Sequence, residues 1–282
     1  ANRFNGPPTP PGMRRSRLSH LARRGSDNLA KMPSANPSLT FSTAMNPEAN
    51  TPAFLPFGQP HFGPDEVAAV TRVLESGWVG MGPETLAFEE ELARFTGCRE
   101  VVSVNSCTAA LFLSLLVSGV GPGDEVICPS LTWCATANAA LYLGARVVFA
   151  DVEPRSLCIT PQTVKACLSV RTKAVIPVHF GGLAVDTAGI RAVMPKKVAL
   201  IEDAAHALGA RDRSGAFVGA AGNLTCFSFY ANKNLSTGEG GAIALNDPEL
   251  AARLRSLRQN GLPENAWKRF SQPGRPTGQQ AI

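Results

Sequence analysis

Short apolar segments alternate with helical segments from residue 100 to residue 257. Seven of the apolar segments have the length and β-branched content of strands: 100–105, 123–130, 146–152, 173–180, 198–204, 225–230 and 240–247. Apolar strands that are separated by helices pair in parallel and are covered on both faces. The pattern therefore predicts an α/β fold, a three-layer sandwich with a mostly parallel sheet, in which the last segment forms a hairpin-like arm.

Helices are expected at 64–75, 84–96, 108–118, 136–143 and 248–260. In the first, second and last of these, apolar residues recur every three or four positions. In the first of them, Val67, Val70 and Leu74 fall on one face. The longest apolar stretch, 109–117, is much shorter than the roughly 20 residues of a membrane span, so no membrane association is expected.

Composition divides the chain into three regions. Residues 51–262 carry the regular pattern and are expected to form one folded domain, and residues 263–282 form an irregular tail. Residues 1–50 are rich in Pro, Ser, Asn and Arg and predict a disordered basic tail, which accounts for the whole net charge of +5. A neutral folded part disfavours nucleic-acid binding. Alternatively, the tail is a targeting segment or precedes the true translation start.

The seven cysteines are scattered at positions 98, 107, 128, 134, 158, 167 and 226 and form no pair or His cluster with zinc spacing. This spacing is typical of small buried residues in a reducing compartment. The sequence therefore predicts a cytoplasmic protein without a metal site.

Lys233 lies between an aromatic strand and a glycine-rich turn, in the segment FSFYANKNLSTGEGGAI. Burial favours the neutral form of an amine, and a neutral amine can attack an aldehyde. Taken alone, the segment is more typical of a surface lysine in a loop.

Asp203 ends an apolar strand, at the edge where open α/β sheets bind their ligands. A carboxylate at this place can pair with the ring nitrogen of a bound cofactor. For an isolated aspartate, helix capping and metal binding are alternatives.

A helix N-terminus follows Asn105 and opens with Ser106, Cys107 and Thr108. Unpaired N–H groups and the helix dipole make such an N-terminus a phosphate-binding site, although a cap without a ligand is commoner. Ser228, five residues before Lys233, can add a hydroxyl group to the same phosphate.

Trp133 also follows a strand, and its side chain can stack on a flat ring. The alternative is a core tryptophan. The phosphate-binding N-terminus, the aromatic ring, the carboxylate and the lysine each come just after a strand, in this order. Together they match the parts of a pyridoxal phosphate (PLP) site.

These segments resemble the DegT/DnrJ/EryC1/StrS family of sugar aminotransferases, which are fold-type-I PLP-dependent enzymes. The resemblance runs from about Phe54 to Gly261 and includes VNSCTAALFLSL, GDEVICPSLTWCATANAALYLGA and IEDAAHALGA. It implies that residues 51–262 form the large, PLP-binding domain of such an enzyme. Members that act on UDP-linked 4-keto sugars are especially similar.

The resemblance implies a role for each candidate residue. Lys233 would carry PLP and move a proton between substrate and cofactor, and Asp203 would hold the pyridine nitrogen. Trp133 would stack on the ring, and His206 would lie near the ring oxygen. The phosphate would be bound by Cys107, Thr108 and Ser228.

The implied reaction has two halves. Glutamate or another amino donor converts PLP to pyridoxamine phosphate and leaves as a keto acid. The amino group then passes to the ketone of a nucleotide-linked sugar, which yields an amino sugar for polysaccharide, lipopolysaccharide or antibiotic biosynthesis. The resemblance further implies a homodimer.

The C-terminal segment departs from the family pattern. Family members continue past the position of Gly261 into a GYNYR-like motif and a smaller C-terminal domain, and residues 263–282 resemble neither. The small domain is therefore expected to be missing, and a catalytically impaired homologue is an alternative function. A PLP-dependent sugar dehydratase is another, which Lys233 disfavours because such enzymes carry histidine in its place.

Overall fold

The computed structural model describes Pro56 and residues 58–262, so both predicted tails lie outside the described residues. The helices are α2 (Pro64–Ser76), α3 (Pro83–Thr96), α4 (Cys107–Val117), α5 (Cys134–Leu141), α6 (Pro161–Cys167), α7 (Thr187–Val193), α8 (Pro248–Leu257) and the 3-10 helix η1 (Phe180–Gly182). The strands are β1 (Glu100–Val104), β2 (Glu125–Pro129), β3 (Arg146–Ala150), β4 (Thr172–Val175), β5 (Ala199–Asp203), β6 (Leu224–Ser228) and β7 (Gly241–Leu245). All five predicted helices are present, and α6 and α7 are two short helices that the hydrophobic pattern did not reveal.

The strands form one sheet in the order β1-β7-β6-β5-β4-β2-β3. The five neighbouring strands β6, β5, β4, β2 and β3 run parallel to one another. Strand β7 is antiparallel to both of its neighbours, β6 and β1. The prediction of a mostly parallel sheet is confirmed. The predicted hairpin is present, because β7 pairs antiparallel with the preceding strand β6, but it is not an arm: β7 also pairs with β1, and all five of its residues are buried inside the sheet.

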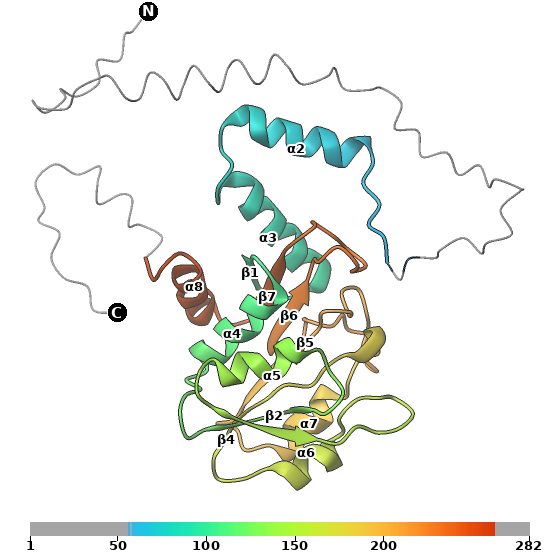
Figure 1. Ribbon diagram of the computed structural model, residues 1–282, viewed down its shortest axis with the longest axis vertical. Helices are drawn as coiled ribbons and strands as arrows, with labels where there is room; N and C mark the ends of the chain where they lie inside the picture. The colour runs from blue at the N-terminus through green and yellow to red at the C-terminus, as the bar shows by residue number, and fades with distance from the viewer. Residues whose placement is uncertain (1–55, 57, 263–282) are drawn as a thin grey trace, which may run out of the picture. The chain divides into compact units, whose positions relative to one another are not determined.

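Helices cover both faces of this sheet (Figure 1). On one face, α4, α5 and α8 pack around a core that includes Leu111, Leu115 and Leu254. On the other face, α6 and α7 contribute Val164 and Ile190 to a second core, and α3 covers the end of the sheet formed by β1, β7 and β6. The predicted three-layer sandwich is confirmed.

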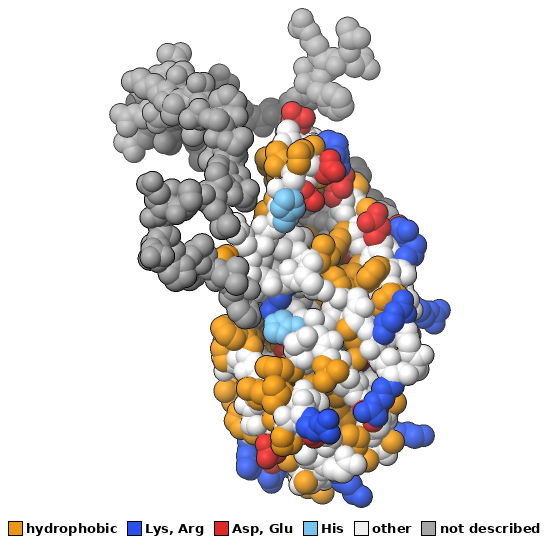
Figure 2. Space-filling view, turned by 90° about the vertical axis from the view of Figure 1, so that its right-hand side faces the viewer, with side chains coloured by type: hydrophobic (Ala, Val, Ile, Leu, Met, Phe, Trp, Pro, Cys, Tyr) orange, Lys and Arg blue, Asp and Glu red, His pale blue; other side chains and the backbone are white. Residues whose placement is uncertain are grey.

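Helix α2 buries none of its residues among the described part of the chain. Its predicted apolar face is present, but Val67, Val70 and Leu74 are 62, 59 and 64% exposed. Figure 2 shows hydrophobic side chains at the surface near the upper end of the molecule, where Figure 1 places α2. The helix is specified locally: Pro64 opens it, the Glu66 carboxylate accepts the Gly63 N–H (2.6 Å), and Gly77 ends it with φ 72°.

Five of the seven cysteines are buried, Cys134 is exposed and Cys167 is half-buried. Within the described ranges, no three His, Cys, Asp or Glu side chains cluster in a way that suits a metal ion. None of the helices described is both long enough and apolar enough to cross a membrane.

Candidate functional site

Six of the seven strands direct their carboxyl ends to one edge of the sheet, because only β7 runs in the opposite direction. The ends of β1, β2, β5 and β6, with the segments that follow them, carry all of the predicted site residues. The topology therefore brings to one edge residues that lie up to 126 positions apart, from Cys107 to Lys233.

Asp203, the last residue of β5, is 5% exposed. Its Oδ2 accepts a hydrogen bond from the Thr136 hydroxyl at 2.7 Å, and its Oδ1 accepts the Ala205 N–H at 3.2 Å. The Thr136 hydroxyl also lies 2.7 Å from the hydroxyl of Thr132. Burying a carboxylate is unfavourable unless its oxygens are hydrogen-bonded, and these bonds fix the direction of the Asp203 side chain toward the start of α5.

The N-terminus of α4 presents backbone donors at the same edge. Ser106 caps the helix by accepting the Ala109 N–H at 3.2 Å. The N–H groups of Cys107 and Thr108 have no hydrogen-bond partner among the described residues, and Thr108 is exposed. Two free N–H groups at the positive end of a helix form a site for an anion.

The thiol of Cys107 points away from this edge. It donates to the backbone oxygen of Cys226 at 3.6 Å in the core. Burial raises the pKa of the Cys107 thiol well above its ordinary value, Asp203 adds to this effect, and the positive charge of Lys233 opposes it. Cys107 therefore offers a ligand its backbone N–H and not its sulfur atom.

Gly241, the first residue of β7, has no side chain, and this allows the sheet to lie close to the N-terminus of α4. A Cβ atom at this position would lie 2.5 Å from the carbonyl carbon of Ser106 and 2.6 Å from the nitrogen of Cys107. Gly241 is also the strand partner of Ser228, which is 8% exposed and accepts the Tyr230 N–H at 3.4 Å. The Ser228 position is thereby adjacent to the N-terminus of α4, as the phosphate-site hypothesis requires.

Lys233 lies in the loop between β6 and β7 and is half-buried. Its N–H donates to the Tyr230 oxygen at 2.9 Å, and the next side chain, Asn234, donates to the Leu208 oxygen at 2.6 Å. The positive charge of Lys233 affects the pKa of both Cys107 and His206. The anchored loop thus follows β6 at the same edge of the sheet, and the charge of Lys233 acts on groups at the N-terminus of α4 and after the end of β5.

His206, three residues after Asp203, has an exposed side chain. Its pKa is lowered by partial desolvation and then by the charge of Lys233, against the opposite effect of Asp203. The lowered pKa favours the neutral imidazole, which can donate or accept a hydrogen bond without adding charge.

Trp133 is the residue before α5 and is 77% exposed. The alternative of a core tryptophan is therefore wrong. Trp133 stands three residues before Thr136, which binds Asp203. The exposed ring of Trp133 therefore follows β2 at the edge of the sheet that holds Asp203, and its faces are free to stack on a flat ligand.

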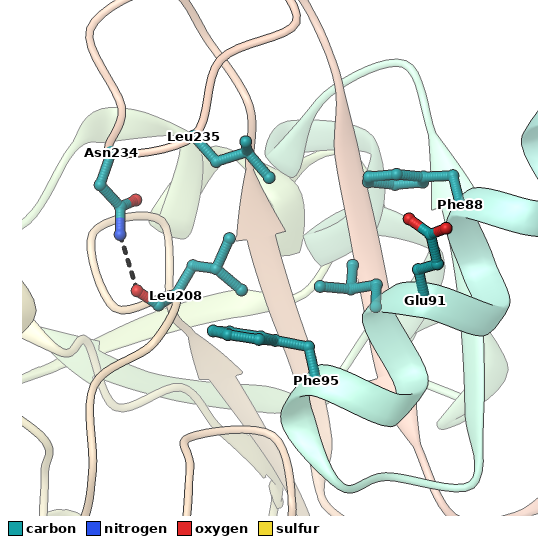
Figure 3. Close-up of a pocket in the computed structure, with 7 residues that line it drawn as sticks. Phe88, Glu91, Phe95, Leu208, Asn234 and Leu235 are labelled. Carbon is teal, nitrogen blue, oxygen red and sulfur yellow. Dashed lines mark hydrogen bonds between the residues drawn. The ribbon is translucent and has the colours of Figure 1, made fainter.

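A separate cavity of about 370 Å³ lies against the residues that follow Lys233, and it is lined by Phe88, Glu91, Leu92, Phe95, Leu208, Asn234 and Leu235. Figure 3 shows Phe95, Leu208 and Leu235 directed toward a common space, with the hydrogen bond from Asn234 to Leu208 beside it. No predicted site residue lines this cavity. It lies on the α3 side of the lysine loop and is distinct from the site at the strand ends.

Thr136 and Gly241 are two residues of this site that the sequence reasoning missed. The place of Thr136 in the first turn of a helix next to Trp133 is a weak signal, because its hydroxyl could equally cap the helix. Gly241 belongs to a glycine-rich turn, but only the contact with Ser106 shows which glycine is required.

A model of the DegT/DnrJ/EryC1/StrS aminotransferase family matches residues 60–279. The chain belongs to this family. The match also extends beyond Gly261, where the recognised resemblance ended. The spore coat polysaccharide biosynthesis protein SpsC of Bacillus subtilis (strain 168) is 47% identical over 222 residues, which cover 78% of this chain and 57% of SpsC.

Solved structures give the same relationship. DesV of S. venezuelae, in complex with a ketimine intermediate, is 42% identical with a TM-score of 0.67, over 69% of this chain and 53% of DesV. Spr1654 of Streptococcus pneumoniae in its PMP form is 31% identical with a TM-score of 0.72, over 76% of this chain and 59% of Spr1654. A synthase of 3-amino-5-hydroxybenzoic acid is 36% identical with a TM-score of 0.65, over 79% of this chain and 56% of the synthase. The chain therefore spans little more than half the length of each of these relatives.

Proposed function

We propose that this chain is the large-domain part of a PLP-dependent aminotransferase that transfers an amino group from glutamate to a nucleotide-linked keto sugar. The observation that carries the proposal is the convergence of a buried carboxylate, two free helix N–H groups and an anchored lysine at one edge of the sheet. Family membership and relatives solved in PLP and PMP forms support the same cofactor.

The residues present fit PLP. This cofactor is a flat aromatic ring that carries a phosphate, an aldehyde and a ring nitrogen, and each of these groups needs a different kind of partner. The phosphate suits the free N–H groups of Cys107 and Thr108, with the hydroxyl of Ser228 adjacent. The ring nitrogen suits Asp203, because a buried carboxylate stabilises a protonated nitrogen. The exposed ring of Trp133 suits stacking on the cofactor.

When bound, PLP supplies an aldehyde that joins an amine and a ring that withdraws electrons. The amine of Lys233 would hold the cofactor and would act as the base and acid that moves a proton of the substrate. His206, whose pKa is lowered, would lie near the ring oxygen and could form a hydrogen bond with it.

The substrate class is proposed from the relatives. SpsC is named for spore coat polysaccharide biosynthesis, and Spr1654 for a sugar aminotransferase activity. These names favour a sugar, and the phosphates of a nucleotide carrier would provide additional binding energy. A carbocyclic keto acid is the second candidate, because a related chain is a synthase of 3-amino-5-hydroxybenzoic acid.

The proposed domain organisation follows the same relationship. Residues 51–262 would form the PLP-binding large domain, and the two regions that flank it, 1–50 and 263–282, lie outside the described residues. We also propose a homodimer located in the cytoplasm. Light scattering of the purified chain, with and without PLP, measures whether it dimerises.

The test of the function is covalent trapping of PLP. The purified chain is incubated with PLP, reduced with borohydride and digested, and the modified peptide is sequenced by mass spectrometry. Attachment at Lys233, abolished in Lys233→Ala, is the expected result. In a separate sample that is not reduced, glutamate should release 2-oxoglutarate and leave pyridoxamine phosphate, so that borohydride added afterwards attaches no cofactor to Lys233.

A folded sample that binds no PLP, or that attaches it to other lysines equally, would overturn the proposal and favour the impaired homologue. Nucleotide-linked keto sugars and carbocyclic keto acids are then compared as amino acceptors. Loss of a substrate hydroxyl in place of amine transfer would indicate the dehydratase instead.

A further inference from the structure

A second buried carboxylate lies directly beside Asp203 in the sequence and on the opposite face of β5. Successive side chains of a strand alternate between faces, so Asp203 meets Thr136 on the α4–α5 face while Glu202 faces the α6–α7 side. Glu202 is 2% exposed, and its Oε2 lies 2.8 Å from Nε2 of His179, which is 1% exposed. The proposed function uses neither residue.

The hydrogen bonds determine which nitrogen of His179 carries its proton. The backbone N–H of Val185 donates to Nδ1 at 3.0 Å, so Nδ1 must be an acceptor. The proton therefore lies on Nε2, which donates it to Glu202. The other Glu202 oxygen accepts from the Asn223 amide at 2.8 Å and the Thr225 hydroxyl at 3.3 Å. Both ring nitrogens and both carboxylate oxygens have partners, which leaves the ring one orientation.

The His179 segment also holds the main chain of Asp203. The N–H of His179 donates to the Asp203 oxygen at 3.0 Å, and the N–H of Asp203 donates to the Pro177 oxygen at 2.9 Å. These two bonds extend the parallel ladder past Val175, where β4 ends, through the isolated bridge between Val178 and Asp203. The end of β5 is thus fixed by a neighbour that is itself fixed by Glu202.

We propose that His179 is a positioning residue for the cofactor site. Held by Glu202 and Val185, it fixes the main chain of Asp203 so that the Asp203 carboxylate keeps its direction toward the ring nitrogen of PLP. This inference rests on the proposed function for its ligand, whereas the clamp on the end of β5 exists without any cofactor.

The variants are His179→Leu, which removes both ring hydrogen bonds, and His179→Gln, whose amide offers one acceptor and one donor. Val164→Ala, in the core of the same face but on α6, is the control for loss of stability alone. Each 282-residue chain is measured far below its unfolding temperature. Hydrogen–deuterium exchange of the segment 199–207 is followed without PLP, and PLP affinity is followed by absorbance titration.

His179→Leu should accelerate exchange in 199–207 and weaken PLP binding by about 10-fold, the lower end of what outer hydrogen-bond partners contribute at metal sites. His179→Gln should restore most of both, and Val164→Ala should change neither. Should the leucine variant fail to fold, Glu202→Gln, which keeps the volume and removes the charge, carries the same expectation for both measurements.

The inference would be overturned if hydrogen–deuterium exchange of 199–207 and PLP affinity changed no more in His179→Leu than in Val164→Ala. The hydrogen bond between His179 and Glu202 would then be only a contact within the core. Failure of the proposed function has a different signature. The wild-type chain would then bind no PLP at Lys233, while the exchange measurement on the cofactor-free chain would still decide whether His179 fixes the end of β5.

Discussion

Helices α2 and α4 carry different apolar patterns in the sequence, and their environments are opposite. α4 buries seven of its eleven residues between the sheet and the neighbouring helices. α2 buries none of its thirteen, although Val67, Val70 and Leu74 share one face as predicted. The one-sided repeat of α2 thus corresponds to a surface helix, and the almost continuous apolar stretch of α4 corresponds to a core helix.

The difference shows what a hydrophobic repeat does and does not determine. A repeat specifies which residues share a face, and local signals such as Pro64 and Gly77 specify where the helix begins and ends. What covers the face depends on residues elsewhere in the chain. α4 is held by tertiary burial, and its N-terminus can therefore serve as a fixed part of a site. α2 is defined by its own caps.

The largest expected effect comes from truncating the buried face. Leu111 of α4 is 1% exposed, so Leu111→Ala removes packed methyl groups and leaves a cavity. We expect the free energy of unfolding to fall by about 2–5 kcal/mol. Urea denaturation followed by circular dichroism measures it. A loss under 1 kcal/mol would mean that α4 is no better packed than α2.

The next effect concerns the close approach of β7 to α4. A Cβ atom at Gly241 would meet the backbone of Ser106 and Cys107, which cannot move as easily as a side chain. Gly241→Ala should reduce the free energy of unfolding by about 1–3 kcal/mol and should weaken PLP binding, because the free N–H groups of α4 are displaced.

Gly80, between α2 and α3, is the matched control for Gly241. A Cβ atom at Gly80 meets nothing within 4 Å, so Gly80→Ala should leave both stability and PLP affinity close to those of the unchanged chain. Absorbance titration and urea denaturation compare the two variants. Equal effects of the two substitutions would show that the α4 N-terminus does not depend on the glycine.

Thiol reactivity offers a third comparison of the two helices. Burial raises the pKa of the Cys107 thiol, so the thiol stays protonated as the pH rises from 7 to 9. A thiol placed on α2 by Val70→Cys replaces a side chain that is 59% exposed. We expect iodoacetamide to modify Cys107 at least about 100-fold more slowly, because its reaction requires local opening.

Peptide mapping by mass spectrometry gives the two rates in one sample. Raising the pH should accelerate modification of the α2 thiol, through its thiolate, and should leave native Cys107 slow. Exposed Cys134 provides an internal control for reagent access near the site. Rapid modification of Cys107 in the folded chain would contradict the buried direction of its side chain.

Much of the fold follows from local pattern. The helix expected at 108–118 is Cys107–Val117, and Asp203 ends β5 as predicted. The strand order does not follow in this way. The sequence of β7 shows a buried strand next to a glycine-rich turn, and nothing local indicates that it enters the sheet between β6 and β1. Pairing of β7 with β1 joins residues more than 130 positions apart.

The site is predictable to a similar extent. Each candidate residue stands after a strand, and parallel strands bring such residues to one edge. The contacts that orient them depend on packing: the bond from Thr136 to Asp203 spans 67 positions, and the turn of the Cys107 thiol toward Cys226 spans 119. No local pattern encodes these pairs, so the roles stay predictions until PLP binding is measured.

The smallest expected effect comes from the same kind of substitution as Leu111→Ala, made on the exposed face of α2. Leu74 of α2 is 64% exposed, so Leu74→Ala removes little packing and exchanges two good helix formers. The free energy of unfolding should change by no more than about 0.5 kcal/mol, measured by urea denaturation beside Leu111→Ala. A loss above 1 kcal/mol would mean that some part of the chain outside the described residues, or a second copy, covers the apolar face of α2. A difference that then depends on protein concentration would assign the cover to the second copy, because only association between chains varies with concentration.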